Sequence, residues 1–283
     1  HKVFKIMSDT PSISVVMSVF NGENFIRESV ETILNQSFED YEFIIIDDGS
    51  TDSSLKLLQE YANLYPCIRL VKRKNSGLTK SLIFGCNIAN GKYIARQDVD
   101  DYSDLDRLKL QFDRLENDEN LVLIGSWYEV LDESNMSVIK KPIDDDKIIK
   151  RNMFYNNPFC HSSVMFRKDS YHNTFGYDIT YKTSQDLDLW FKLAIIGKVG
   201  MVEQILVKRT LHKDSVSRSN NAWIQLKNGF RIRKKYLHVF YKHSSILVIY
   251  VSSLYGFLMI YLPTVLSKRV SALVRFINIK TKI

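Results

Sequence analysis

The sequence is poor in cysteine and lacks the common glycine-rich phosphate loops. Its 283 residues include three cysteines, Cys67, Cys86 and Cys160, whose wide separation matches no metal-binding or redox motif. So small and odd a number fits a reducing compartment and cysteines that serve as small buried hydrophobic residues. No G-x-G-x-x-G and no Walker A lysine motif is present. If the chain binds a nucleotide, a metal is therefore expected to neutralise its phosphates.

The chain also lacks internal repeats and low-complexity linkers. Its residues are 45% hydrophobic and 25% charged, which suffices for one large core or two small ones. The formal net charge is +7 and the pI is about 9.1. This basic balance favours an anionic partner, for which nucleic acid, phospholipid head groups and nucleotide phosphates all qualify.

Strand and helix patterns alternate through the first hundred residues. Apolar runs typical of strands buried on both faces lie at 13–20, 41–50, 68–73 and 92–97. Apolar residues at helical spacing predict helices at 21–36, 51–65 and 77–91. The alternation predicts a parallel, doubly wound sheet, in which ligands bind outside the carboxyl ends of the strands.

The pattern is less regular after residue 120. Further strands are predicted at 121–131, 162–168 and 202–212, and a helix at 184–197. With no linker before them, these elements are expected to continue the first unit.

The last quarter differs in composition. Residues 221–243 form a strongly basic, aromatic-rich predicted helix, and residues 244–267 then carry no charge. An uncharged apolar stretch of about this length is a transmembrane candidate. Because both flanks are basic, an interfacial or re-entrant helix fits equally well.

Carboxylates gather where the predicted strands end. Asp47 and Asp48 close the second strand, and Asp98 and Asp100 follow the fourth. Side chains at i and i+2 of an extended segment point the same way. Asp98 and Asp100 could therefore share one Mg²⁺ or Mn²⁺ completed by substrate phosphates. The alternative is a solvated acidic turn that caps the next helix, in which Leu105 and Leu108 are expected on one face.

Two more side chains near these strand ends have a functional and a structural interpretation. Asp48 could accept hydrogen bonds from a nucleobase or ribose, or it could cap the helix that follows. Lys80, in the third predicted helix, could reach a diphosphate, or it could be a solvated surface lysine.

Three segments, in this order, resemble family 2 glycosyltransferases. They are SVVMSVFNGENFIRESVETILNQSFEDYEFIIIDDGSTDSS, NSGLTKSLIFGCNIANGKYIARQDVDD and SQDLDLWFKL, and the similarity extends over about residues 12–215. The resemblance implies the GT-A fold, a Rossmann-like α/β architecture with a mostly parallel central sheet flanked by helices. It also implies a nucleotide-sugar donor, a UDP-sugar above all, an inverting mechanism, and Mn²⁺ or Mg²⁺ as cofactor.

The resemblance assigns roles on the donor side. Ser18, Phe20 and Asn21 would border the base, and Phe20 lacks the hydroxyl of the tyrosine more usual at its position. Asp48 matches the aspartate that contacts uracil in related UDP-dependent enzymes. Asp98 and Asp100 match the family's D-x-D motif, with Asp100 as the direct metal ligand.

The resemblance also assigns roles on the acceptor side. Asp186 falls on the general base, although a helix-terminal carboxylate favoured by the helix dipole is the alternative. Gln185 replaces the usual neighbouring acid, and loss of that charge would by itself lower the pKa of Asp186. His161 matches a histidine that lines the acceptor side. His212 could ligate the metal or contact the diphosphate; a structural or solvent-facing histidine is the alternative.

The expected organisation follows from the resemblance and from the basic C-terminal quarter. Residues 1–218 would form the GT-A domain, with a nucleotide-binding half at 12–118 and an acceptor half at 119–218, and 219–283 a helical membrane-associating region. We expect a lipid-linked saccharide acceptor and no nucleic acid partner. The expected place is the cytoplasmic face of a bacterial inner membrane, peripheral or anchored by the C-terminal segment, in O-antigen, capsule or exopolysaccharide synthesis.

Two other functions share parts of this pattern. A sugar nucleotidyltransferase has a similar α/β layout and acidic metal site, but its usual glycine- and lysine-bearing loop is missing from SVFNGENF. The other is a catalytically inactive, membrane-bound protein that binds sugar nucleotides. The presence of all four motif aspartates argues against it: Asp48, Asp98, Asp100 and Asp186.

Overall fold

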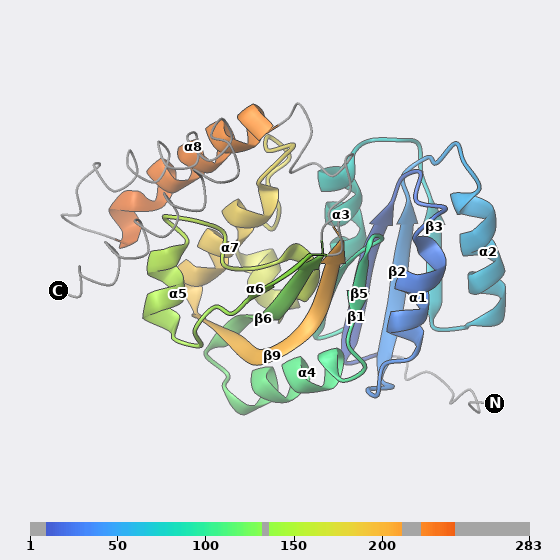
Figure 1. Cartoon of the computed structure of the whole chain (residues 1–283), viewed down its shortest axis with the longest axis horizontal. Helices are drawn as coiled ribbons and strands as arrows, with labels where there is room; N and C mark the ends of the chain where they lie inside the picture. The colour runs from blue at the N-terminus through green and yellow to red at the C-terminus, as the bar shows by residue number, and fades with distance from the viewer. Residues whose placement is uncertain (1–9, 132–135, 211–221, 241–283) are drawn as a thin grey trace.

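The computed structural model describes residues 10–131, 136–210 and 222–240, in which nine strands form one sheet covered by helices (Figure 1). The strand order is β3-β2-β1-β4-β8-β6-β9-β5, and β7 pairs with β6 outside this path. Each strand and helix predicted from the sequence pattern within these residues has a counterpart, although several bounds differ.

The first half of the sheet is parallel, as predicted. Its strands are β1 (Ile13–Val19), β2 (Tyr41–Asp47), β3 (Ile68–Lys72) and β4 (Tyr93–Asp98). The connecting helices are α1 (Ile26–Leu34), α2 (Ser54–Leu64) and α3 (Leu78–Asn87). Alternate side chains of β1 enter different cores: Val15 packs in the cluster that includes α1, and Val16 in the one that includes α3. Burial of both faces explains the continuous apolar runs.

The second half of the sheet is mixed, which corrects the expectation of a mostly parallel sheet. Its strands are β5 (Asp101–Ser103), β6 (Leu121–Leu131), β7 (Ser137–Lys140), β8 (Met165–Arg167) and β9 (Lys198–Thr210). Only β6 and β9 pair in parallel, whereas β4–β8, β6–β8, β6–β7 and β5–β9 are antiparallel. A parallel pair of successive strands requires a long crossover, and the short link between β6 and β7 cannot provide one, so these two strands pair in antiparallel fashion.

The remaining helices surround this half. They are α4 (Arg107–Asn117), α5 (Asp146–Asn152), the 3₁₀ turn η1 (His161–Ser163), α6 (Lys168–Asn173), α7 (Gln185–Ile196) and α8 (Ala222–Phe240). The helix expected directly after the acidic segment begins later, because β5 intervenes. Leu108 is fully buried in α4, whereas Leu105 precedes this helix and is 55% exposed, so the two do not share a buried face.

The basic segment at 221–243 contains the predicted helix. Ile232 and Tyr236 of α8 are buried in the hydrophobic cluster that also contains Leu187 and Trp190 of α7. Figure 1 shows α8 lying alongside α7. His212 and the uncharged stretch 244–267 lie outside the described residues. Among the residues described, no helix is long and apolar enough to cross a membrane.

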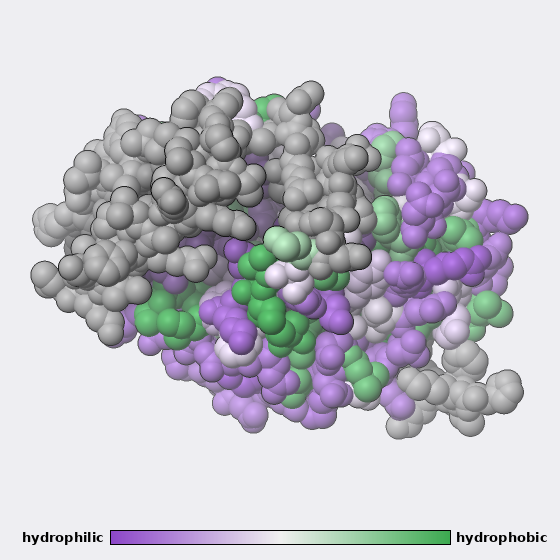
Figure 2. All heavy atoms as spheres, in the orientation of Figure 1, coloured by the Kyte–Doolittle hydropathy of each residue, from purple (hydrophilic) through white to green (hydrophobic). Residues whose placement is uncertain are grey.

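The surface reflects the same division between core and solvent. In Figure 2 the face over α1 and α2 is mainly hydrophilic, as expected for helices that bury one side against a sheet. Cys86 and Cys160 are buried, as predicted, and Cys67 is only half-buried.

Candidate active site

Parallel pairing brings the predicted donor-side carboxylates to one edge of the sheet. Ser18 of β1 is paired with Asp98 of β4, and the next residue, Val19, is paired with Asp47 of β2. The amide of Asp48 donates to the carbonyl of Val19 at 2.8 Å, so Asp48 lies at the same edge. The carboxyl ends of three adjacent strands therefore meet, as the doubly wound pattern predicts.

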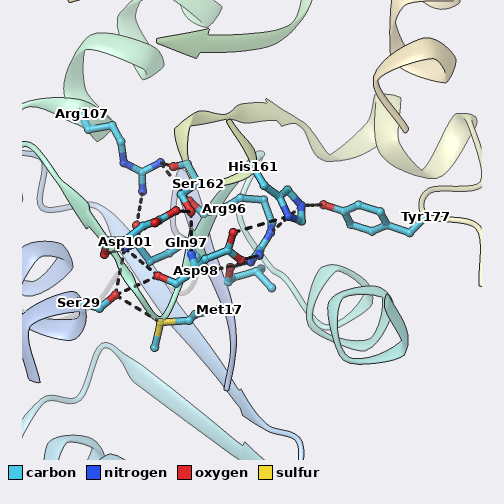
Figure 3. Close-up of polar contacts among 11 residues, drawn as sticks. Met17, Ser29, Arg96, Gln97, Asp98, Asp101, Arg107, His161, Ser162 and Tyr177 are labelled. Atoms are coloured by element: carbon cyan, nitrogen blue, oxygen red, sulfur yellow. Dashed lines mark hydrogen bonds and ion pairs between the residues drawn. The ribbon is translucent and has the colours of Figure 1, made fainter. Parts of the chain in front are cut away.

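Asp98 forms an ion pair with an arginine of its own strand. Arg96 Nη2 lies 2.6 Å from Asp98 Oδ1, and the other guanidinium nitrogens donate to the carbonyls of Val16 and Gln97 and to His161 Nε2 (Figure 3). Burial by itself raises the pKa of Asp98, but the charge of Arg96, together with smaller effects of His161, Arg209 and the Ser162 hydroxyl, holds that pKa below its usual value. Asp98 is therefore ionised near neutral pH, and its side chain is 28% exposed.

Two further arginines face the acidic segment. Arg107 is fully buried and donates to the carbonyls of Arg96 at 3.1 Å and Ser162 at 2.9 Å. Burial lowers the pKa of Arg107 to about 9, so it stays charged at neutral pH. Arg209 of β9 is paired with Asp101 of β5, and it lies close enough for its charge to act on the aspartates of the segment. Part of the positive charge that balances these carboxylates thus comes from the chain itself.

Asp101, which directly follows the D-x-D motif, is a buried structural residue and not part of a solvated turn that caps the next helix. Its Oδ2 accepts a hydrogen bond from the Ser162 hydroxyl, and its carbonyl accepts one from Gln97 at 2.6 Å (Figure 3). Burial and then the charges of Asp98 and Asp100 raise the pKa of Asp101 well above its usual value. Asp98 and Asp101 therefore occupy different environments, although only two residues separate them in the sequence.

His161 lies beside Asp98 and connects it to Tyr177, in the predicted acceptor half of the chain. Its Nε2 is 3.2 Å from Arg96 Nε and 2.8 Å from the Tyr177 hydroxyl (Figure 3). Because a guanidinium can only donate, Nε2 accepts and the ring proton lies on Nδ1, 3.8 Å from Asp98 Oδ2. Burial and then the charge of Arg96 lower the pKa of His161 to about 3, so the ring is neutral. Its ring also meets that of Trp190 of α7, edge to face, at 5.9 Å.

Asp186 is the second residue of α7, and its environment favours the protonated form. Its Oδ2 accepts a hydrogen bond from Asn157 Nδ2 at 2.6 Å. Burial raises the pKa of Asp186, and the charge of Asp98 raises it further, against the lowering effect of the hydrogen bonds. The substitution at Gln185 by itself acts in the opposite direction, but burial outweighs it. Gln185 is buried, and its Oε1 has no hydrogen-bond partner among the described residues.

Asp48 holds the loop that leads into α3. Its Oδ1 accepts hydrogen bonds from the amide and hydroxyl of Ser76 and from the hydroxyl of Ser81, at 3.0, 3.2 and 2.8 Å. Its Oδ2 accepts one from the amide of Gly77 at 2.8 Å. Since each carboxylate oxygen can accept about two hydrogen bonds, capacity is left on Oδ2 alone.

The other predicted donor-side residues lie around this loop. Asn21 accepts a hydrogen bond from the Thr51 amide at 2.8 Å, so its side chain fixes the loop after β2. Phe20 is 51% exposed, Lys80 is exposed, and Ser18 is half-buried at the end of β1. The fold thus gathers Ser18, Phe20 and Asn21 near Asp48.

The acidic edge fits a divalent cation only in part. Among the described residues, no group of three or more histidine, cysteine, aspartate or glutamate side chains could hold a metal ion. Two carboxylates, those of Asp98 and Asp100, are a donor set that suits Mg²⁺ when substrate phosphates complete it. Asp98 Oδ2 is not used by Arg96. His212, the third predicted ligand, lies outside the described residues.

Sequence reasoning missed Arg96, Arg107, Asn157 and Tyr177. Arg96 carried one available signal, because a charged residue in the middle of the apolar strand YIARQD must be buried with a partner. The other three residues come from distant segments, and the sequence holds no periodic or motif signal that would join them.

Comparison with known proteins identifies the chain. The sequence model of glycosyl transferase family 2 matches residues 14–175. An uncharacterized glycosyltransferase of Haemophilus influenzae is 30% identical over 223 residues, which cover 75% of this chain and 69% of that protein. The glycosyltransferase EpsE of Bacillus subtilis is 35% identical over 192 residues, 66% of this chain and 68% of EpsE.

A solved structure shares the fold. Staphylococcus aureus TarS 1–349, solved in complex with UDP-GlcNAc, has a TM-score of 0.63 at 16% identity, over 93% of this chain and 83% of that one. At this identity the similarity concerns the fold alone. The family match covers the strands and helices that build the acidic edge, and on this basis the chain belongs to glycosyl transferase family 2.

Proposed function

We propose that the protein transfers a sugar, with inversion, from a nucleotide-diphosphate donor to a hydroxyl of a saccharide acceptor. One observation carries the proposal: Asp98, at the end of β4, and Asp186, at the start of α7, lie close enough that the charge of Asp98 raises the pKa of Asp186. A donor-side and an acceptor-side carboxylate thus share one site. The UDP-GlcNAc bound to TarS supports a UDP-sugar as the donor.

The donor would lie across the carboxyl ends of β1, β2 and β4. Asp48 Oδ2 has capacity for one donor group of a base, and Ser18, Phe20 and Asn21 would border it. Lys80 would pair with a phosphate. Asp98 and Asp100 would hold Mn²⁺ or Mg²⁺, which when bound neutralises charge on the leaving diphosphate.

Asp186 would act as the general base. Ionised, it takes the proton of the acceptor hydroxyl, whose oxygen attacks the anomeric carbon from the face opposite the nucleotide. Asn157 donates to Oδ2, and the acceptor hydroxyl would approach the carboxylate at Oδ1. The raised pKa brings this carboxyl closer to neutrality, where a base accepts protons more effectively. A single displacement of this kind inverts the anomeric centre.

The acceptor proposed is a lipid-linked saccharide at the cytoplasmic face of a bacterial inner membrane, in O-antigen, capsule or exopolysaccharide synthesis. Three exposed basic residues of α8 support an anionic surface as a neighbour: Lys227, Arg231 and Lys234. Each such cation near an anionic bilayer contributes roughly 1 kcal/mol. His161 and Gln185 are proposed to face the acceptor side.

The test is a donor screen with the full chain. UDP-, GDP- and dTDP-sugars are incubated with octyl glycosides as acceptors, with and without Mn²⁺, and release of nucleoside diphosphate is measured. Release that depends on a sugar donor and is lost in Asp186→Asn, with donor binding retained, is the expected result. Formation of a nucleotide sugar from a sugar phosphate would instead indicate a nucleotidyltransferase. Turnover retained in Asp186→Asn would show that Asp186 is not the general base.

A further inference from the structure

The helix α8 contacts the segment that carries Asp186. Asn228 Nδ2 donates to the carbonyl of Thr183 at 3.2 Å and to its hydroxyl oxygen at 3.1 Å. The hydroxyl of Ser184 donates to the carbonyl of Gln225 at 3.2 Å. Thr183 and Ser184 directly precede α7, so α8 fixes the backbone immediately before Asp186.

A second set of contacts lies further along both helices. Asp188 is fully buried, and its Oδ1 lies 2.9 Å from Lys235 Nζ and 3.0 Å from the Tyr236 hydroxyl. The Tyr236 ring stacks on that of Phe191, with centroids 5.0 Å apart. Asp188 is two residues after Asp186, so α8 contacts the first turn of α7 on both sides of Asp186 in sequence.

The backbone between these contacts is strained. Ser184 has a φ of 62°, in the left-handed region, which costs a non-glycine residue about 1–3 kcal/mol. Such a conformation persists only where its surroundings hold it. One holding contact comes from α3, where the Thr79 hydroxyl donates to the Tyr181 carbonyl at 3.0 Å. Those on the other side come from Gln225 and Asn228 of α8.

We propose that α8 is a positioning element for Asp186 and that Asn228 is its main positioning residue. This inference rests on the proposed role of Asp186 as the base. Asn228 is 9% exposed, and among the described residues it supplies two of the three side-chain hydrogen bonds that join α8 to Thr183 and Ser184. Without these bonds the turn at Ser184 relaxes, and the carboxylate of Asp186 moves relative to the donor side. A displacement of about 1 Å at a reacting group can cost about 100-fold in rate.

The test compares Asn228→Ala with a control, His238→Ala, at an exposed residue of the same helix. With the donor and acceptor found active in the screen, Asn228→Ala is expected to lower kcat by about 10- to 100-fold. The Kd for UDP, measured by calorimetry, is expected to stay within about twofold. His238→Ala should leave both quantities unchanged.

Hydrogen exchange gives a readout that does not depend on substrate. In Asn228→Ala, amides of residues 183–188 are expected to exchange faster, while those of β4 keep wild-type rates. Faster exchange throughout the protein, together with weaker UDP binding, would show a merely structural role and overturn the proposal. If Asn228→Ala does not fold, Asn228→Asp, which keeps the shape but not the amide hydrogens, is measured instead.

The two proposals fail in different ways. If Asp186→Asn is inactive while Asn228→Ala keeps full kcat and wild-type exchange, the positioning role alone is wrong. If Asp186→Asn keeps full turnover, the base assignment is wrong and the positioning of a base falls with it.

Discussion

Arg96 connects the chemistry of the site with the stability of the fold. Its guanidinium is fully buried, neutralises Asp98 and donates to two backbone carbonyls and to His161. A buried charge is tolerated only when paired and hydrogen-bonded. The acidic edge is therefore stabilised by protein cations before any donor binds.

Replacement of Arg96 by methionine is expected to destabilise the protein. Arg96→Met leaves Asp98 without its nearest cation, and removing one partner of a buried ion pair costs about 3 kcal/mol. Urea denaturation measures the change in free energy of unfolding. Lys109→Met, which removes an exposed pair with Asp113, is the matched control and should cost under about 0.5 kcal/mol. Equal free energies of unfolding for Arg96→Met and the wild type would show that the ion pair between Arg96 and Asp98 does not stabilise the fold.

The raised pKa of Asp186 predicts the acid limb of activity. Only the ionised carboxylate can accept the proton of the acceptor. Turnover should therefore fall as the pH is lowered through a value above about 4, the ordinary carboxyl pKa. The pH profile of kcat measures this limb. A midpoint at or below pH 4 would show that burial does not govern Asp186.

The same shift predicts that Asp186→Asn does not destabilise the protein. The folded pKa lies above the unfolded one, so the unfolded state binds fewer protons and stability falls as pH rises between the two values. At pH 7 the charged Asp186 is therefore a burden, and Asp186→Asn should melt at or above the wild-type temperature. The contrast is Asp188→Asn, which weakens charged contacts to α8 and should cost about 2 kcal/mol. A Tm for Asp186→Asn below that of the wild type would refute this.

At the scale of elements, the close approach of α3 to β1 depends on one glycine. A Cβ on Gly85 would lie 2.6 Å from Val16 Cγ1 in the core. The first residues of α3 and its preceding loop also hold Asp48, so a displaced α3 would disturb the donor side. The packing of α3 on the sheet and the proposed contact between Asp48 and the nucleobase are therefore linked.

Two glycine-to-alanine substitutions in helices test this packing. Gly85→Ala should destabilise by about 1–3 kcal/mol through overpacking, and should weaken UDP binding. In α8, a Cβ on Gly229 would meet only the end of the Arg233 side chain, at 2.9 Å. Gly229→Ala should therefore keep most of the helix-propensity gain of about 1 kcal/mol. Thermal melts and UDP calorimetry measure both, and a stabilised Gly85→Ala would show that α3 does not approach the sheet so closely.

At the scale of the whole molecule, the charge of α8 and its position against α7 both bear on how the protein would attach to a membrane. One face of this helix packs on α7, and Lys227, Arg231 and Lys234 are exposed. If α8 binds a membrane surface while it contacts the start of α7, membrane attachment would be coupled to the candidate active site.

Vesicle binding tests that arrangement. The full chain should sediment with vesicles of phosphatidylglycerol and phosphatidylethanolamine, and less with phosphatidylcholine alone. Charge reversal at Lys227, Arg231 and Lys234 should weaken binding by about 1 kcal/mol or more per residue. Added salt should weaken it as well, because surface charges are screened. Binding that ignores salt and lipid charge would contradict an electrostatic role for α8.

The sequence alone determined most of the strands and helices, and the family, whereas β5, β7, α5 and α6 were not predicted from it. Strands buried on both faces leave continuous apolar runs, and amphipathic helices leave a period of 3.6 residues. The order of the motifs resembles family 2, to which the chain belongs. The strand ends also placed Asp48 and Asp98 at one edge, because parallel strands all end on the same side. None of this required knowledge of distant contacts.

Tertiary structure alone decided the partners. Arg96, Arg107 and Arg209 share the charge of the acidic segment, Asp101 turns inward, and the second half of the sheet is mixed. The packing of α8 against α7, and with it the contacts at Ser184, could not be predicted from the sequence either. Burial and ion pairing depend on segments up to about a hundred residues apart, and local periodicity carries no information about which of them meet.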